Sequence, residues 1–229
     1  MYVYGVEPII NDFYDANYAR ILSTGLLGKL QIRVHNIIDK PLSRNYYEKI
    51  LEVGAGDLEH FKRFQLSFSD YWATDIRMSK VPKKKFEKQN SLLTLVYADA
   101  QNLSFKDNSF DLLLATCLLI HLPNPEKALK EWRRVVKDGG EIVIYVPCDP
   151  GLLIRFSRIL FVLPKHSRNK SRNYRTLCAK EHVSSLHVLN VLIKDTFKCD
   201  KIKIRRWPYR FFGWNLNLAY VYHIEVRKS

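Results

Sequence analysis

Cysteines are few and widely separated in this chain of 229 residues, and no C-x-x-C pair occurs. The four are Cys117, Cys148, Cys178 and Cys199. Their spacing lacks the pattern of a zinc site or a disulfide framework, and it predicts reduced thiols, no metal and a cytoplasmic protein. Signal-peptide features are lacking at the N-terminus, and no apolar run is long enough to span a bilayer. With only nine glycines and nine prolines, the composition is that of an ordinary globular chain.

Acidic residues are scarce in the last third of the chain. Residues 1–150 carry 20 Lys and Arg and 19 Asp and Glu, a formal charge of +1, whereas residues 151–229 carry 17 and 4, a formal charge of +13. Such segregation predicts that the last third meets an anionic partner, although a solvated basic surface is the plain alternative.

Strand and helix patterns alternate through the middle of the chain. Five short apolar runs predict strands, at 49–53, 71–76, 93–99, 110–117 and 141–146. Residues 125–137 predict a helix, with Asn124 as N-cap and Gly139-Gly140 after its end. Apolar strands separated by helices are typical of a parallel sheet covered on both faces.

The C-terminal residues predict an antiparallel addition to this sheet. A helix is expected from about 180 to 197, followed by strands at 201–207 and 218–226. The predicted fold class is therefore α/β, a Rossmann-like, doubly wound, mostly parallel seven-stranded sheet with an antiparallel terminal hairpin. Four parts are expected: an N-terminal helical cap (1–45), a cofactor-binding core (46–148), a basic and apolar lid insertion (149–179) and the terminal helix and strand pair (180–229).

Two glycines directly follow the first predicted strand, in the segment GAGDLE from Gly54 to Glu59. A nicotinamide-binding turn would have Gly or Ala where Glu59 stands, and a phosphate loop would need G-K-[ST], which is absent. The third alternative is an adenosine cofactor without phosphates, which tolerates acids near the turn.

From Tyr47 to Pro147 the sequence resembles the class I S-adenosylmethionine-dependent methyltransferases, in the broad small-molecule group. The resemblance rests on ILEVGAGDL, on the acids Asp75 and Asp99, and on the long segment from Tyr97 to Pro147. It implies S-adenosylmethionine as cofactor, with Asp75 at the ribose and Asp99 at the adenine. A third glycine that is frequent in the family is replaced here by Leu58. The cofactor-binding residues that it implies are Glu52, Gly54, Ala55, Gly56, Asp75, Ile76, Asp99, Ala100 and Cys117. Tyr14 and Tyr18, four residues apart on the first predicted helix, would close over the cofactor, with ordinary core packing as the alternative.

Catalytic candidates are two histidines. A hydroxyl acceptor needs a base, and His is the usual choice. His121 follows the fourth strand, with a loop-capping role as the alternative, and His182 is expected at the edge of the buried face of the helix from residue 180. His166 remains open, and a surface role is the better reading of His187.

The function expected is methyl transfer to a small molecule or saccharide, as an O-methyl transfer to an anionic, phosphate-bearing acceptor. Arg168, Arg172 and Arg175 are expected to hold that acceptor. The basic last third keeps RNA methylation open as an alternative, and a non-catalytic scaffold with the same fold is a second one. The segment LLIRFSRILFVL allows peripheral membrane contact or a lid helix, Trp207 and Trp214 allow an aromatic platform or core packing, and no stable protein partner is predicted.

Overall fold

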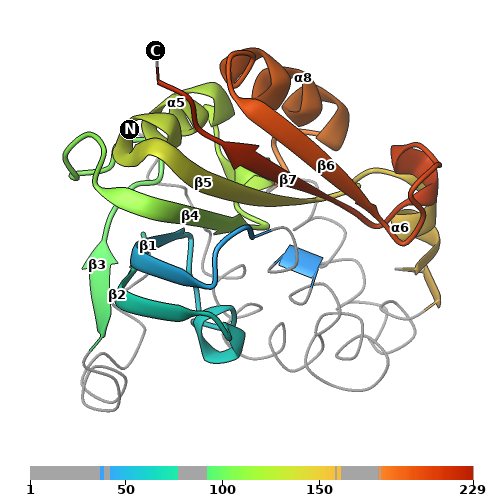
Figure 1. Ribbon diagram of the computed structural model, residues 1–229. Helices are drawn as coiled ribbons and strands as arrows, with labels where there is room; N and C mark the ends of the chain where they lie inside the picture. Colours follow the sequence, from blue (N-terminus) through green and yellow to red (C-terminus); the bar gives the residue numbers. More distant parts are fainter. Residues whose placement is uncertain are drawn as a thin grey trace.

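One seven-stranded sheet runs through the computed structural model, which describes residues 37–38, 42–76, 92–157, 159–160, 180 and 182–228. The strand order is β3-β2-β1-β4-β5-β7-β6, and Figure 1 shows its twist. The first five strands are parallel, while β7 runs antiparallel between β5 and β6. This arrangement confirms the predicted Rossmann-like fold class. The strands are β1 Tyr46–Val53, β2 Ser67–Asp75, β3 Leu93–Tyr97, β4 Phe110–Thr116, β5 Val136–Pro147, β6 Lys201–Trp207 and β7 Ala219–Glu225.

The order reverses between β1 and β4, which are hydrogen-bonded neighbours in the sheet. From β1 the chain proceeds to β2 and β3 on one side, and β4 begins the other side. Loops that leave such a switch point diverge, so the carboxyl ends of β1 and β4 border a ligand crevice in open α/β sheets. The sequence of β4, FDLLLAT, is almost wholly buried, as expected for a central strand.

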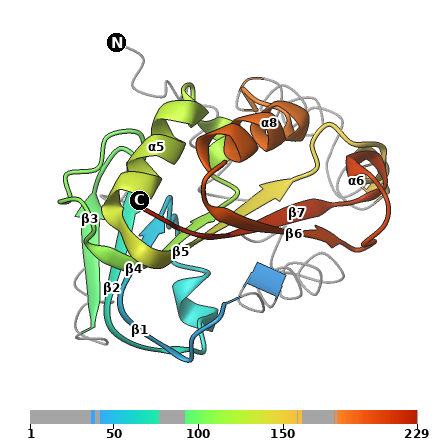
Figure 2. The same cartoon turned by 45° about the horizontal axis from the view of Figure 1, so that its top comes forward.

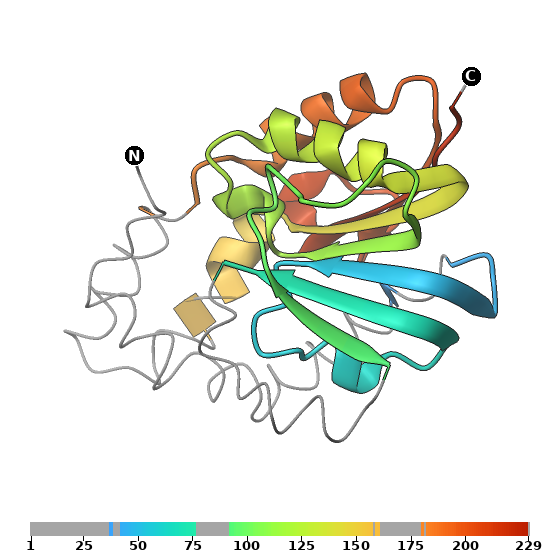
Figure 3. The ribbon, with the colours of Figure 1, turned by 90° about the vertical axis from the view of Figure 1, so that its left-hand side faces the viewer.

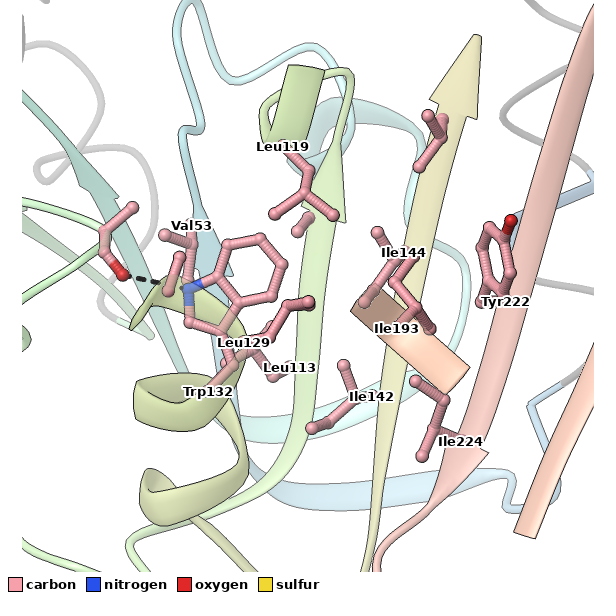
Figure 4. Close-up of a cluster of buried hydrophobic side chains, with 14 of the residues drawn as sticks. Val53, Leu113, Leu119, Leu129, Trp132, Ile142, Ile144, Ile193, Tyr222 and Ile224 are labelled. Atoms are coloured by element: carbon pink, nitrogen blue, oxygen red, sulfur yellow. Dashed lines mark hydrogen bonds between the residues drawn. The ribbon is translucent and has the colours of Figure 1, made fainter. Parts of the chain in front are cut away.

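Two helices, α5 (Pro125–Val135) and α8 (Leu186–Thr196), lie side by side on one face of the sheet (Figures 2 and 3). Trp132 of α5 is fully buried there among β1, β4 and β5, and Ile193 of α8 packs toward β5 and β7 (Figure 4). Arg133 of α5 forms an ion pair of 2.7 Å with Asp200, which lies between α8 and β6 and has a buried side chain. This layer fixes the loops that leave β3, β4 and β5.

Helix boundaries differ from the predictions at two places. The helix predicted over 125–137 ends at Val135, and Gly139-Gly140 lie inside β5, which starts at Val136. There they permit a tight bend, because Gly139 has a φ of +68° and a Cβ on Gly140 would lie 2.6 Å from the Val136 side chain. The predicted N-cap is confirmed, since Asn124 accepts a hydrogen bond from the Lys127 amide.

The helix predicted from about residue 180 instead begins at Leu186. Ser185 is its N-cap, with extended backbone angles and a side chain that accepts a hydrogen bond from the Val188 amide. Serine competes for backbone amides and therefore starts helices more readily than it continues them. His182 consequently lies before the helix, in a non-helical segment, and not on its buried face.

The helical spacing of Leu58, Phe61 and Phe64 after the glycine turn predicts a helix there, and this prediction is wrong. Only a 3₁₀ turn, Phe61–Arg63, forms there. Strand β2 starts at Ser67, four residues before the predicted 71, which leaves a short connection. Phe61 and Phe64 pack their rings on Tyr71 of β2, at centroid distances of 4.9 and 5.9 Å. The regular spacing arises because these aromatic side chains are buried against β2. The 3₁₀ turn buries them without a longer helix.

Several predictions fall outside the described residues. They are most of the N-terminal cap and of the lid, together with Tyr14, Tyr18, His166, Arg168, Arg172 and Arg175. Of the lid, the structure describes α6 (Leu152–Ser157) and residues 159–160.

Candidate active site

The glycine turn that ends β1 is hydrogen-bonded to the end of β2. The amides of Gly54 and Ala55 donate to the Thr74 carbonyl at 2.8 and 3.0 Å. The Gly56 amide donates to Oδ2 of Asp75 at 2.9 Å. Three successive amides of the turn thus have partners within the protein, and a carboxylate stands beside them. This arrangement differs from a phosphate cradle, in which such amides point at the anion.

The two positions of the turn require glycine for different reasons. Gly54 has a φ of +72°, and a Cβ there would lie 2.8 Å from the Leu118 side chain, so the loop after β4 presses directly on the turn. Gly56 has a φ of +48°, and a Cβ there would meet open space. Glycine at position 56 therefore serves the backbone conformation, and it leaves the space beside the turn open to a ligand.

Leu58, which stands where the related family often has glycine, also adopts a left-handed conformation, with a φ of 62°. Such a conformation costs a non-glycine residue roughly 1–3 kcal/mol. The Leu58 side chain is fully buried in the cluster beneath β1 and β2, and burying a leucine stabilises by about 1.5–3 kcal/mol. The two effects are of similar size, which explains how leucine is accommodated at a position that favours glycine.

Glu52 lies inside β1, fully buried, and its Oε2 accepts a hydrogen bond of 2.7 Å from the Tyr71 hydroxyl. The hydroxyl of Thr74 donates to the Glu52 carbonyl at 3.1 Å. Glu52 thereby links β1 to β2 just before the turn. In this structure its carboxylate is bonded to β2, next to the strand end from which the turn begins.

A second acidic loop follows β3 and carries Asp99. Oδ1 of Asp99 accepts a hydrogen bond of 2.9 Å from the Gln101 amide, and Gln101 accepts one of 2.9 Å from the Asn124 amide. The Trp132 indole donates to the Ala100 carbonyl at 3.0 Å, the dashed line in Figure 4. Helix α5 therefore holds the loop of Asp99 in place from beneath, through a contact that sequence reasoning missed.

The end of β4 brings two further predicted residues to the same edge. Cys117 follows β4 with a φ of 54°, donates its amide to the Tyr145 carbonyl at 3.1 Å, and is exposed. Ile76 directly follows Asp75 after β2 and is partly buried. The carboxyl ends of β1, β2, β3 and β4 thus gather the predicted residues that the structure describes, at the switch point of the sheet.

A histidine–aspartate cluster lies at the next strand end. The 3₁₀ turn Leu119–His121 follows β4, and the amides of Val183 and Ser184 donate to the Ile120 carbonyl. These bonds bring the rings of His121 and His182 to a centroid distance of 5.1 Å, edge to face. Nδ1 of His182 is paired with Oδ2 of Asp149, which stands two residues after the end of β5 at Pro147.

Sequence reasoning missed Asp149, although a signal was present. It stands just beyond a predicted strand, where the carboxyl ends of a parallel sheet meet, but the segment Asp149-Pro150-Gly151 was interpreted only as a turn. The pair is partly accessible: the side chains of His182 and Asp149 are 19% and 9% exposed. A carboxylate on Nδ1 keeps a proton there and makes Nε2 the basic nitrogen of the ring.

The remaining predicted residues lie away from this cluster. His187 is exposed on α8, in agreement with its surface interpretation. Trp214 is partly buried against the core of α5 and α8, in agreement with the packing alternative, and Trp207 ends β6. Among the described residues no group of three metal-ligating side chains converges.

Known proteins resemble this chain in sequence and in fold. Residues 51–144 match the methyltransferase domain family. The uncharacterized protein MJ1123 of Methanocaldococcus jannaschii is 29% identical over 68% of this chain and 74% of that protein. The ubiquinone/menaquinone biosynthesis C-methyltransferase UbiE of Laribacter hongkongensis is 33% identical over 42% of this chain and 41% of its own length. This chain thus aligns with less than half of that enzyme.

Among solved structures, phosphoethanolamine N-methyltransferase 2 of Haemonchus contortus, in complex with S-adenosyl-L-methionine, superposes with a TM-score of 0.65. It shares 16% identity, over 98% of this chain and 61% of that one. At this identity the likeness shows a shared fold.

The turn fits S-adenosylmethionine better than a nucleotide with phosphates. Its three amides are engaged by Thr74 and Asp75, so they are not directed at a pyrophosphate, and the space beside Gly56 is open. A cofactor with ribose hydroxyls and a zwitterionic amino acid needs no such amides, and its hydroxyls can donate hydrogen bonds to a carboxylate. The matched domain, the strand order and this turn agree: residues 51–144 match a methyltransferase domain, within a sheet that has the fold of the class I S-adenosylmethionine-dependent methyltransferases.

Proposed function

We propose that this protein transfers a methyl group to a hydroxyl oxygen of an anionic small molecule or saccharide, with His182 as the proton acceptor and Asp149 as its positioning partner. The observation that carries the proposal is the pairing of His182 with Asp149 beside His121, at the strand ends next to the glycine turn. Leu118 contacts Gly54 and stands three residues before His121, which places the cluster close to the predicted cofactor turn.

Gly54, Gly56, Asp75 and Asp99 would hold the cofactor, which supplies an electrophilic methyl group when bound. The chain must then orient the acceptor and remove its proton. A hydroxyl is a poor nucleophile until a base withdraws that proton, and a positioned base accelerates such a step about 10²–10⁴-fold. Nε2 of His182 accepts the proton, and the carboxylate of Asp149 stabilises the imidazolium that forms. The His121 ring lies edge to face against the His182 ring, at a centroid distance of 5.1 Å.

An anionic acceptor is proposed because the cations and the acids of the chain are segregated. Residues 151–229 carry 17 Lys and Arg but only 4 Asp and Glu. The insertion that contains Arg168, Arg172 and Arg175 follows β5, at whose end Asp149 stands. Guanidinium groups pair with phosphate oxygens in two parallel hydrogen bonds, so a phosphate-bearing acceptor such as a sugar nucleotide suits this composition.

The test is a transfer assay with radiolabelled cofactor against sugar nucleotides, phosphorylated glycans, phenols, amines and RNA. Label should appear as a base-stable ether on a hydroxyl acceptor. Preferential labelling of RNA would favour the alternative suggested by the basic last third. Failure to bind the cofactor would favour a scaffold.

A second experiment tests the anionic acceptor. Replacing Arg168, Arg172 and Arg175 with Ala should raise the acceptor KM strongly and leave cofactor affinity unchanged. The matched control is a triple replacement of Lys194, Lys198 and Lys201, which are exposed on and after α8. If both triple variants behave alike, the acceptor is not held by these arginines.

A further inference from the structure

Exposed apolar side chains crowd the segment that follows β5. Helix α6 and the two residues described after it present four large hydrophobic residues to solvent: Leu152, Phe156, Ile159 and Leu160. A six-residue helix at the carboxyl edge of the sheet has little need of so many exposed apolar groups. Single exposed hydrophobic residues are ordinary, whereas a contiguous group marks a binding surface.

A second group lies in the loop between β6 and β7. Tyr209, Phe211, Phe212 and Leu216 are exposed there, and the Phe211 ring is the most exposed, at 93%. The loop is firmly built around Asn217, which is fully buried. Its amide oxygen accepts from Tyr209 N at 2.8 Å, and its amide nitrogen donates to the carbonyls of Phe212 and Gly213. The fold therefore holds these rings outward.

The two groups are adjacent. Gly151, just before α6, approaches Trp214 so closely that a Cβ would lie 2.8 Å from the Trp214 carbonyl oxygen. Strand β7 starts opposite the end of β5, where Ala219 pairs with Pro147, so the loop and α6 share one edge of the sheet. Figures 1 and 2 both place α6 beside this loop. We call the surface made by residues 152–157, 159–160 and 209–216 the rim patch.

Cations accompany the rim patch, and acids are missing from it. Arg155 on α6 and Arg206 and Arg210 at the loop are exposed, and Arg206 lies 5.6 Å from the centre of the Tyr220 ring. No Asp or Glu occurs in the sequence from residue 150 to 180, or from 201 to 224. The surface is therefore both apolar and positively charged.

This combination favours a lipid surface over the other occupants. A second copy of the chain would bring like charges face to face across a two-fold interface, which is unfavourable. RNA would be met by aromatic stacking, but Leu152, Ile159, Leu160 and Leu216 offer no π face. Aromatic and aliphatic side chains beside arginines are typical of segments that lie in the interface of an anionic bilayer. No helix among the described residues is long and apolar enough to cross a membrane, which agrees with shallow insertion.

We propose that the rim patch docks the protein on the surface of an anionic lipid bilayer, with the aromatic rings in the headgroup region and the arginines at lipid phosphates. This inference goes beyond the proposed function, since it requires neither catalysis nor a particular acceptor. It also turns the carboxyl edge of the sheet, with His182 and Asp149, toward the lipid.

The test is sedimentation of the full chain with vesicles. The protein should partition to vesicles of mixed phosphatidylcholine and phosphatidylglycerol, weakly to phosphatidylcholine alone, and less as salt is raised. Phe156→Ser combined with Phe211→Ser should weaken partition at least about tenfold. Arg155→Gln combined with Arg210→Gln should weaken it roughly 25-fold, since each cation contributes about a fivefold factor at an anionic surface.

Matched controls separate docking from general stickiness. Val188 and Val191 are exposed on α8, so their replacement by Ser should leave partition unchanged, as should Lys194→Gln with Lys198→Gln. Cofactor affinity of every variant checks that the fold is intact. The proposal is overturned if wild-type protein ignores anionic vesicles or if control and rim variants lose partition equally. Phe211-dependent dimerisation in light scattering, or Phe211-dependent binding of single-stranded RNA without vesicle partition, would also overturn it.

Discussion

Two carboxylate–histidine pairs lie at opposite edges of the same sheet, and their surroundings differ. His182 and Asp149 stand at the carboxyl edge, where β5 ends. His223 of β7 and Glu141 of β5 stand near the amino edge, with 2.7 Å between Nε2 and Oε2. The side chains of His223 and Glu141 are more deeply buried, at 6% and 2% exposed, than those of His182 and Asp149, at 19% and 9%.

The hydrogen-bond partners of Glu141 and Asp149 indicate different roles for these two carboxylates. Glu141 also accepts hydrogen bonds from the Tyr47 hydroxyl and from Ser43, so it is surrounded by fixed donors of the chain. Burial disfavours its charged form, but the hydrogen bonds from His223 and Ser43 outweigh burial and hold the pKa of Glu141 below its ordinary value. A carboxylate saturated in this way stabilises the fold. Asp149 instead orients a histidine that solvent reaches, which is what proton transfer to a substrate requires.

The largest expected effect separates the two pairs by activity. His182→Ala should lower kcat about 10²–10⁴-fold, because the proposed base is lost, and Asp149→Asn should lower it less. Cofactor affinity should change little. His223→Phe is the matched control, since it removes a histidine at the other edge, and its folded fraction should keep near wild-type kcat. Equal activity of His182→Ala and wild type would remove His182 from the mechanism.

The reverse effect is expected in stability. Removing one partner of a buried pair leaves the other charge or dipole unsatisfied, so Glu141→Ala should lower the free energy of unfolding by about 3–5 kcal/mol in urea denaturation. The exposed pair of Lys201 with Glu225 provides the control. Glu225→Ala should leave the free energy of unfolding almost unchanged, because solvent-exposed ion pairs contribute little. Similar losses of unfolding free energy in both variants would mean that the hydrogen-bond network around Glu141 does not stabilise the fold more than a surface ion pair does.

The pH dependence of stability provides a further test of the role of Glu141. The pKa of Glu141 is lower in the folded protein than its ordinary value of 4.5. Its contribution to stability is therefore complete above that value and is lost as pH falls through the lower, folded-state pKa. The stability difference between wild type and Glu141→Gln should shrink as pH is lowered below about 4.5. A difference that grows on acidification would contradict the lowered pKa.

Much of the fold could be predicted from the sequence, but the two carboxylate–histidine pairs could not. Continuous apolar runs such as 110–117 identify central strands because burial on both faces leaves no polar alternation, and the turn at Gly54 and Gly56 predicts the edge at which the cofactor binds. The length of the connection after Leu58 was not predictable, because aromatic burial on β2 imitates helical spacing. Asp149 and His182 are 33 residues apart, and only the folded loops bring them together.

A smaller effect is expected at the ribose position. Asp75→Ala should weaken S-adenosylmethionine binding by about 1.5–3 kcal/mol in calorimetry, which is the contribution of hydrogen bonds to a charged group. Asp75 also accepts the Gly56 amide, so Asp75→Asn, which keeps an acceptor oxygen, should lose less. Asp70→Ala, earlier on β2, is the control and should bind normally. Unchanged affinity in Asp75→Ala would place the ribose elsewhere.

The smallest effect concerns cysteine protection, and it needs no mutation. Cys117 is exposed at the end of β4, beside the predicted cofactor site, whereas Cys199 is exposed after α8 and away from it. Desolvation raises the pKa of the Cys148 thiol and that of the Cys117 thiol alike to about 12, so labelling is run at alkaline pH. Cys148 is also buried, so it should resist alkylation in the folded state. Saturating S-adenosylmethionine should slow iodoacetamide labelling of Cys117 severalfold and leave Cys199 unaffected, as read by peptide mass spectrometry. If the cofactor slows the labelling of Cys117 and Cys199 equally, it protects both by stabilising the whole fold. That result would contradict a cofactor site at the carboxyl end of β4.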